Sequence, residues 1–181
     1  MIDRPLYHWL LGEAARRLPP VIYRMHTTAP RVVAVGTGTV TRGTNVVTRF
    51  LADLHHMPAG GRDRPLTVTF EAVEDGERIM RSYPDTTLIT HQSAGGLAGS
   101  FLLAERFGPF VLSIRLSAGE EGIDFALIGV RWHGMKLPRP AWPRLQASER
   151  ADGEIYRFHV RIDLPLLGRL IEYRGTLQIA T

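Results

Sequence analysis

The chain has 181 residues, of which 44% are hydrophobic and 22% charged, and its formal net charge is +4. This composition is typical of a globular protein and argues against long disordered tails. The sequence contains no cysteine, which excludes disulfides, thiolate metal sites and cysteine nucleophiles. We expect one β-barrel-like domain over residues 1–181.

The basic residues are scattered, and almost all are arginine because Lys136 is the only lysine. No RNP, zinc-finger or helix-turn-helix pattern accompanies them, so we expect no nucleic-acid partner. The N-terminal stretch carries Asp3 and Glu13 among its apolar residues, which is unlike a signal peptide. No apolar run approaches the roughly 18–20 residues that span a bilayer. We therefore predict a soluble, cytoplasmic protein that has no membrane partner.

Residues 5–18 predict a helix that begins at Pro5 and is ended by Pro19 and Pro20. Its apolar residues recur at helical spacing, and we expect it to plug or cover one end of a sheet. Residues 31–42 are rich in valine and threonine and predict a strand that is bent or bulged at Gly36 and Gly38.

A second, short helix is predicted over residues 45–54, with Asn45 as its cap. His55 and His56 follow it. Two adjacent histidines on a loop make a poor chelate, and no spaced His/carboxylate set accompanies them. We therefore expect no metal site, and we interpret this pair as solvated histidines at the helix end.

Residues 66–73 and 77–83 predict a hairpin whose turn is Glu74–Gly76. The inner face of its second strand stays open at this point. Ile79 faces inward together with Glu77, Arg81 and Tyr83, or Met80 does so together with Arg78 and Ser82. Residues 86–92 predict a further strand.

Residues 97–130 predict an antiparallel meander of three strands, with turns at 107–109 and 119–122. Alternation places apolar residues on one face of each strand. These are Leu97, Phe101, Leu103 and Phe107, then Phe110, Leu112, Ile114 and Leu116, then Ile123, Phe125 and Leu127. The first strand also places the carboxylate of Glu105 on its apolar face, which is the most informative feature of the meander.

Residues 131–145 break the alternation, because Pro138, Pro140 and Pro143 exclude a central strand. With Trp132 and Trp142, this segment is either a lid over a barrel mouth or an ordered surface crossover.

The last two predicted strands, 155–164 and 169–179, form a hairpin. Their inward residues are Tyr156, Phe158, Val160 and Ile162, then Ile171, Tyr173, Leu177 and Ile179. In total we expect about nine strands in a mainly β fold. The short connections favour an antiparallel up-and-down barrel or a strongly curled sheet, with an N-terminal helix and one short helix.

The ordered segments LPP (18–20), PAGGRDRPLTVTFE (58–71), GERIMRSY (76–83), ERFGPF (105–110), LPRPAWP (137–143) and LPLLGRLIEYRGTL (164–177) carry a family resemblance. The chain resembles an uncharacterised bacterial domain-of-unknown-function family. That family occurs alone and as the C-terminal domain of saccharopine-dehydrogenase-like NAD(P)-binding proteins. The resemblance implies no catalytic residues, and it implies chemistry on small apolar metabolites.

The candidate site consists of polar and aromatic side chains on faces that alternation turns inward. Glu105 and Tyr173 are the candidate catalytic residues. The candidate ligand-binding residues are Arg81, Tyr83, Phe101, Phe125, Arg131 and Trp142. Glu105 is interpreted either as an acid or base in a pocket or as the structural partner of a buried arginine.

Two functional hypotheses follow. In the first, a barrel pocket binds a hydrophobic or polyketide-like small molecule and catalyses its cyclisation or isomerisation, in a biosynthetic pathway and without a cofactor. In the second, the domain is a non-catalytic module that docks to an NAD(P)-binding oxidoreductase, which rests on analogy alone. A homodimer is compatible with both hypotheses.

Overall fold

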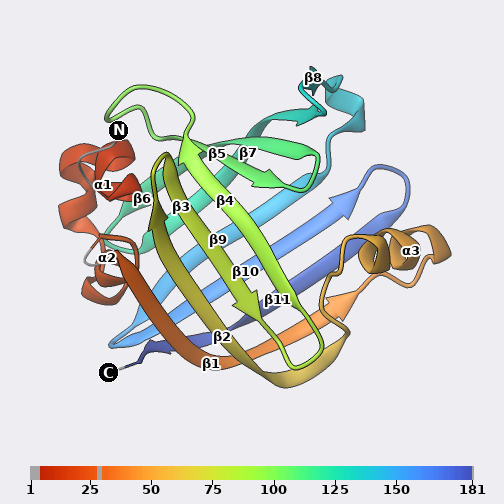
Figure 1. Ribbon diagram of the computed structural model, residues 1–181, viewed down its shortest axis with the longest axis horizontal. Coiled ribbons are helices and arrows are strands. Elements are labelled where there is room, and N and C mark those ends of the chain that lie inside the picture. The colour runs from red at the N-terminus through yellow and green to blue at the C-terminus, as the bar shows by residue number, and fades with distance from the viewer. Residues whose placement is uncertain (1–4, 28–29, 181) are drawn as a thin grey trace.

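The computed structural model describes residues 5–27 and 30–180, which form a mainly β structure (Figure 1). Its strands are β1 (Arg31–Arg42), β2 (Gly61–Val73), β3 (Gly76–Ser82), β4 (Thr87–Ala94), β5 (Leu102–Phe107), β6 (Phe110–Gly119), β7 (Gly122–Trp132), β8 (Met135–Lys136), β9 (Arg144–Asp152), β10 (Ile155–Leu164) and β11 (Gly168–Ile179). Its helices are α1 (Leu6–Leu11), the 3-10 helix η1 (Gly12–Arg17), α2 (Pro20–Thr27), α3 (Val46–Leu54) and the 3-10 helix η2 (Arg139–Ala141).

The strands close into an antiparallel barrel, as the sequence predicts. Their order is β6-β5-β4-β3-β2-β1-β11-β10-β9-β7, and β6 pairs with β7 to complete the ring. The short β8 pairs with β7 alone and stands outside the ring. β9 was not predicted, since its sequence RLQASERAD lacks a clear apolar alternation.

β1 and β11, which are far apart in the sequence, pair in an antiparallel ladder. The ladder extends from Ala34 opposite Ile179 to Arg42 opposite Ile171. Glycine allows a close approach here. A Cβ atom on Gly36 would lie 2.0 Å from the carbonyl oxygen of Thr176. The predicted irregularity of β1 is confirmed, because its register with β2 shifts between Gly38 and Val40.

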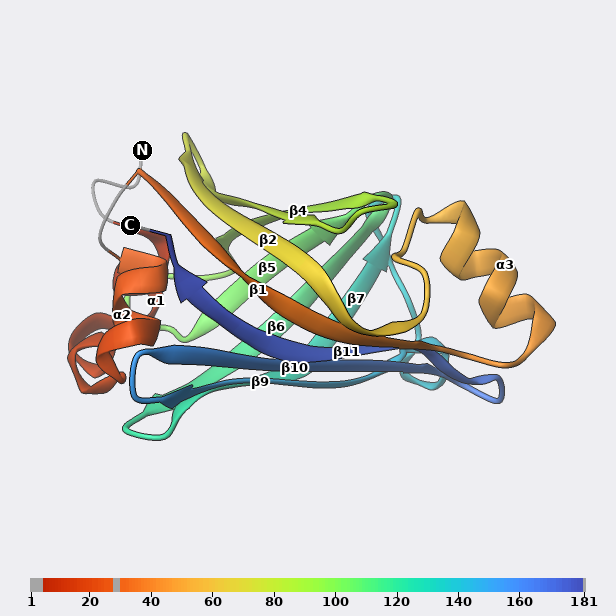
Figure 2. The same ribbon diagram turned by 90° about the horizontal axis from the view of Figure 1, so that it is seen from below.

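One end of the barrel is covered by α1, η1 and α2, and we call it the closed end (Figure 2). Tyr7, Leu10 and Ile22 are fully buried there. The N–H of Phe101 donates to the carbonyl oxygen of Leu10 at 3.0 Å, which ties α1 to the β4–β5 loop. The prediction that a helix plugs one end is confirmed. The predicted end of this helical stretch before Pro19 and Pro20 is confirmed, since η1 ends at Arg17. The separate helix α2, which begins at Pro20, was not predicted.

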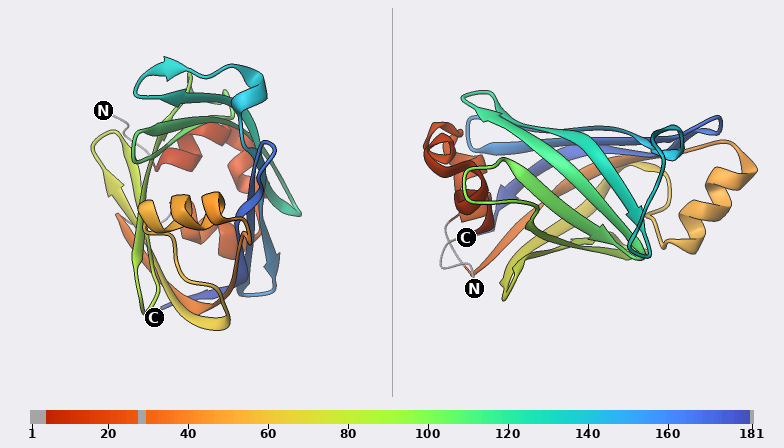
Figure 3. Two further views of the ribbon diagram at one scale, coloured as in Figure 1. Left: turned by 90° about the vertical axis from the view of Figure 1, so that its right-hand side faces the viewer. Right: turned by 90° about the horizontal axis from the view of Figure 1, so that it is seen from above.

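The other end, which we call the mouth, carries α3 (Figure 3). The side chain of Asn45 accepts a hydrogen bond from the N–H of Val47 at 2.8 Å, so the predicted cap is confirmed. The β3–β4, β5–β6 and β10–β11 turns and the segment between β7 and β9 lie at this same end, as the antiparallel order of the strands requires.

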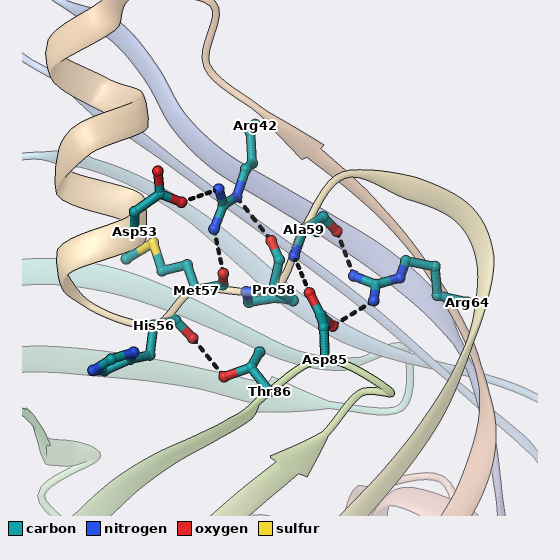
Figure 4. A network of polar contacts seen from close by, with 9 residues as sticks. All are labelled: Arg42, Asp53, His56, Met57, Pro58, Ala59, Arg64, Asp85 and Thr86. Carbon is teal, nitrogen blue, oxygen red and sulfur yellow. Dashed lines mark hydrogen bonds and ion pairs between the residues drawn. The ribbon is translucent and has the colours of Figure 1, made fainter.

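A polar network fixes the segment that follows α3 (Figure 4). The guanidinium of Arg42 donates to Asp53 at 2.5 Å and to the carbonyl oxygen of Pro58 at 2.9 Å. The N–H of Ala59 donates to Asp85, on the β3–β4 turn, at 2.9 Å. These bonds hold the C-terminal end of α3 against the barrel rim.

Candidate functional site

The barrel encloses a cavity of about 130 Å³. Its lining is mostly aliphatic and aromatic and extends from Tyr156, near the closed end, to Met57 and Phe107 at the mouth. The inward positions of β10 and β11 contribute as predicted, with Phe158, Val160, Ile162, Ile171, Tyr173 and Leu177 in the lining. An apolar lining with a few polar groups is typical of small-molecule pockets in proteins.

β3 settles the question of which face of the second hairpin strand points inward. Arg81 and Tyr83 line the cavity, and Glu77 and Ile79 are buried on the same face. The first of the two predicted alternatives is therefore correct. It introduces a guanidinium and a phenol into an otherwise apolar interior.

Arg81 is the central polar group of the cavity. Its Nη1 donates to the hydroxyl of Thr90 at 3.1 Å. Within residues 5–27 and 30–180, no carboxylate lies within ion-pair distance of it. Burial lowers the pKa of Arg81, but the fields of Tyr173 and Glu105 outweigh burial and raise it, so the side chain is a permanent cation. The guanidinium therefore has donors left for a ligand.

Glu105 and Tyr173 lie in the same cavity as Arg81. Glu105 is opposite Gln92 in the β4–β5 ladder, and its inward orientation confirms the predicted alternation. Burial raises the pKa of the Tyr173 phenol, with Arg81 opposing and Glu105 reinforcing that rise. Tyr173 is thus a neutral hydrogen-bond donor at ordinary pH.

Tyr83 lies nearer the mouth, with the guanidinium of Arg64 5.4 Å from its ring centre. Its hydroxyl is buried and has no hydrogen-bond partner within the described residues. Burial raises its pKa to about 12. This hydroxyl is a second group in the lining that a polar ligand atom would satisfy.

A second polar cluster lies towards the closed end, around the fully buried His26 of α2. Its Nε2 is 2.9 Å from a carboxylate oxygen of Glu149, and its Nδ1 is 3.7 Å from one of Glu77. The imidazole stacks on the ring of Tyr7, whose centre is 3.9 Å away. The hydroxyl of Tyr7 donates in turn to Gln92 at 3.0 Å.

The cluster holds a protonated imidazole. Burial lowers the pKa of His26, but the two carboxylates outweigh burial and raise it to about 10. Burial, followed by the charge of Glu149, raises the pKa of Tyr156 well above its usual value. Glu149 and Gln92 line the cavity, so the cluster forms its polar floor.

The structure brings together five of the eight predicted site residues. Glu105, Tyr173, Arg81, Tyr83 and Phe125 all line the cavity. Phe101 does not. It lies just before β5, in the left-handed backbone region at φ 59°, and its N–H is hydrogen-bonded to Leu10 of α1. Leu97, from the same predicted face, is exposed in the β4–β5 loop.

Arg131 was predicted to face inward and does not. The register between β6 and β7 shifts between Ser113 and Ile114, so Ile128 is an extra residue in β7. This bulge reverses the alternation, and Val130 becomes buried while Arg131 is exposed.

Trp142 also lies outside the cavity. Its indole N–H donates to the carbonyl oxygen of Leu137 at 2.9 Å, which folds the proline-rich segment onto itself. No residue of 131–143 lines the cavity, so the segment is a surface crossover and not a lid.

His26 and Glu149 are not among the predicted site residues, because His26 belongs to α2 and Glu149 to β9, and neither element is predicted from the sequence. The spacing of Glu149 from Leu145 by four residues places both on one face of a strand, but the polar character of the segment hid this signal. Within the described residues, no group of three His, Asp or Glu side chains is arranged to hold a metal ion.

The fold and the cavity define a class: a closed antiparallel β-barrel whose interior is apolar and carries a few buried polar groups. The chain belongs to the family described as "Domain of unknown function (DUF4166)", whose model matches residues 18–177. No curated protein and no solved structure matches the chain. Within the described residues, no helix is long and apolar enough to cross a membrane.

Proposed function

We propose that this barrel binds a mainly apolar small molecule in its interior and holds the polar group of that molecule at Arg81. The observation that carries the proposal is the half-buried guanidinium of Arg81, which lines an apolar cavity and, within the described residues, donates one hydrogen bond, to Thr90. A charged group with unused donors in an apolar lining gains from a partner that accepts from it. A ligand oxygen supplies that partner.

The charges around the cavity favour an uncharged polar group over a carboxylate. Arg81 and His26 are cations, and Glu77, Glu105 and Glu149 are acidic side chains around the same interior. A ligand carboxylate would add negative charge to an interior that already has more acids than bases. A carbonyl or hydroxyl oxygen accepts from Arg81 without that cost.

Binding is tested with a fluorescent long-chain polyene alcohol, compared with the acid of the same chain. We expect the alcohol to bind at least tenfold more tightly. Ala147 lines the cavity, so Ala147→Phe fills it and should abolish binding. Ala126→Phe, on an exposed position of β7, is the matched control. Full binding by a folded Ala147→Phe variant would place the probe outside the barrel and contradict the proposal.

The same groups support cofactor-free isomerisation of a β,γ-unsaturated carbonyl compound. Glu105 takes a proton from the carbon between the carbonyl and the double bond, and the oxygen of the resulting dienolate accepts hydrogen bonds from Arg81 and the phenol of Tyr173. Glu105 then returns the proton to the far carbon of the double bond, which moves into conjugation with the carbonyl, so that atoms and charge balance. For cyclisation, an enolate carbon attacks a second carbonyl of the same molecule, and the alkoxide that forms takes the proton from Glu105.

This chemistry is tested with a long-chain methyl ketone in D₂O, by following deuterium uptake beside the carbonyl. We expect the protein to accelerate exchange and Glu105→Gln to abolish the acceleration while the fold stays intact. Glu172→Gln, on the outer face of β11, is the control. If Glu105→Gln instead lowers stability, Glu105 serves the fold through its charge near Arg81, although the two form no ion pair within the described residues.

A further inference from the structure

The helix α3 turns its apolar side towards solvent. Val46, Phe50 and Leu54 recur every four residues and form one stripe, and Phe50 and Leu54 are 63% and 58% exposed. The side of α3 that faces the barrel carries Thr48 and Ala52, with the half-buried Leu51 packed against the core. A surface helix in a globular protein normally buries its main apolar stripe, whereas this stripe is exposed.

Two loops at the mouth expose apolar side chains in the same way. Trp132 and Met135 stand on the β7–β8 hairpin, and Leu166 is fully exposed at the tip of the β10–β11 turn. Leu166 lies in the left-handed backbone region at φ 63°, a position where glycine or asparagine would be easier to accommodate. Three separate segments around one opening therefore present large apolar groups to solvent.

The mouth also carries cations. No Asp or Glu occurs between Asp124 and Glu149, a stretch that includes the whole crossover from β7 to β9. Its basic residues are Arg131, Lys136, Arg139 and Arg144. All four are exposed, and none forms an ion pair with a carboxylate of residues 5–27 or 30–180. Arg49 adds a further exposed cation on α3.

We propose that the mouth of the barrel docks on a bilayer that contains anionic phospholipids. The apolar side chains of α3, the β7–β8 hairpin and the β10–β11 turn enter the interface, and the cations of the crossover meet the lipid headgroups. Apolar tips that are spread over separate segments and flanked by unpaired cations fit a fluid, negatively charged surface better than one continuous protein groove. This proposal differs from the expectation from sequence that the protein has no membrane partner.

The polar network of Figure 4 gives α3 a defined place in this arrangement. Arg42 and Asp85 hold the C-terminal end of the helix and the segment after it at the rim, while the stripe of Phe50 and Leu54 stays outward. Docking would turn the cavity opening towards the bilayer, where apolar molecules partition. The docking proposal stands whether or not the cavity holds a ligand.

The test is flotation with vesicles of phosphatidylcholine alone and with roughly one-third phosphatidylglycerol. We expect binding to the anionic vesicles, at least tenfold weaker binding to the neutral ones, and release by high salt. The double variant Phe50→Ser/Leu54→Ser should lose at least tenfold in vesicle binding, and Arg139→Gln/Arg144→Gln should lose its preference for anionic lipid. Unchanged thermal melting shows that each variant is folded.

The matched control is Val35→Ser/Ile89→Ser, which removes two apolar residues that are similarly exposed, at 46% and 45%, on the barrel wall. It should bind vesicles as the unchanged protein does. Failure of the unchanged protein to bind anionic vesicles overturns the proposal. If Phe50→Ser/Leu54→Ser then converts a dimer to a monomer in light scattering, a second copy covers α3. If the same variant instead abolishes a complex with an oxidoreductase, that oxidoreductase covers α3.

Discussion

The two ends of the barrel are both covered by short helices, yet the helices present opposite faces. At the closed end, α1 and α2 bury Tyr7, Leu10 and Ile22 completely. At the mouth, α3 places Thr48, Ala52 and the half-buried Leu51 against the barrel and leaves Phe50 exposed. The closed end follows the rule that apolar faces are buried, whereas the mouth departs from it. Departures of this kind are where function is to be sought, because stability alone does not explain them.

The largest expected difference between the two ends comes from one substitution made at each. Leu10→Ala removes a fully buried side chain from the closed end and should lower the free energy of unfolding by about 2–5 kcal/mol. Leu54→Ala removes the same atoms from an exposed position on α3 and should cost less than about 0.5 kcal/mol. Urea denaturation of both variants measures the two values.

Equal losses at the two positions would break the comparison. They would mean that the apolar stripe of α3 is covered in solution, by a second copy or by folding back on the barrel. Repeating the denaturation over a range of protein concentrations separates these explanations, because only association makes the midpoint concentration-dependent.

The next effect is the pH dependence that the closed end should impose on the whole fold. The pKa of His26 is raised from 6.5 to about 10 by its carboxylate partners. A raised pKa in the folded state means that the protonated form stabilises the fold. Its contribution is fully present below pH 6.5 and is lost as the pH rises from 6.5 to 10, at up to about 1.4 kcal/mol per unit. Urea denaturation between pH 6 and pH 10 should show this decline.

Replacing the imidazole tests its origin. His26→Gln should be less stable at pH 6, because Glu149 and Glu77 lose their cation, and its stability should be flatter between pH 6.5 and 10. The control is His159→Gln, since His159 pairs with Glu172 on the outer surface and is partly exposed. A decline with pH that persists in His26→Gln would assign it to another group.

The smallest expected effect is local and belongs to the mouth. Asn45→Ala removes the cap of α3 and should destabilise that helix by about 1 kcal/mol. Hydrogen exchange should show faster exchange of the α3 amides, with the barrel amides unchanged. The neighbouring Thr44→Ala, at an exposed position outside the helix, is the control. An effect that spreads to the barrel would show that α3 contributes to global stability.

The barrel was predictable from sequence because its strands alternate and its turns are short. That pattern is strongest in β6, β10 and β11. It fails in β9, whose inward positions are Leu145, Ala147, Glu149 and Ala151 and therefore carry little apolar contrast. The helix α2 was not predicted, because a proline such as Pro20 is equally compatible with the end of one helix and the start of the next.

Alternation along the strands places five of the eight candidate site residues correctly and misplaces others. Glu105, Arg81 and Tyr173 were found because alternation holds through β5, β3 and β11. Arg131 was misplaced because a single extra residue, Ile128, reverses alternation and leaves no mark in composition. His26 could not be found, since its partners Glu77 and Glu149 lie on strands far from it in the sequence and only the closed barrel brings them together.

The pairing of β1 with β11 has a consequence for synthesis. β1 leaves the ribosome before the other strands of the barrel and can pair with β2 once that strand is made. Its other edge stays unpaired until β11, the last strand of the barrel, is made. Until β11 is made, the nascent chain is an open sheet with an unprotected edge, which is a site for wrong pairing between chains. Closure is therefore a late step, and it depends on contacts of high sequence separation, which form slowly. Gly36 and Gly175 in this ladder have no Cβ atom, and this absence allows β11 to approach β1 closely.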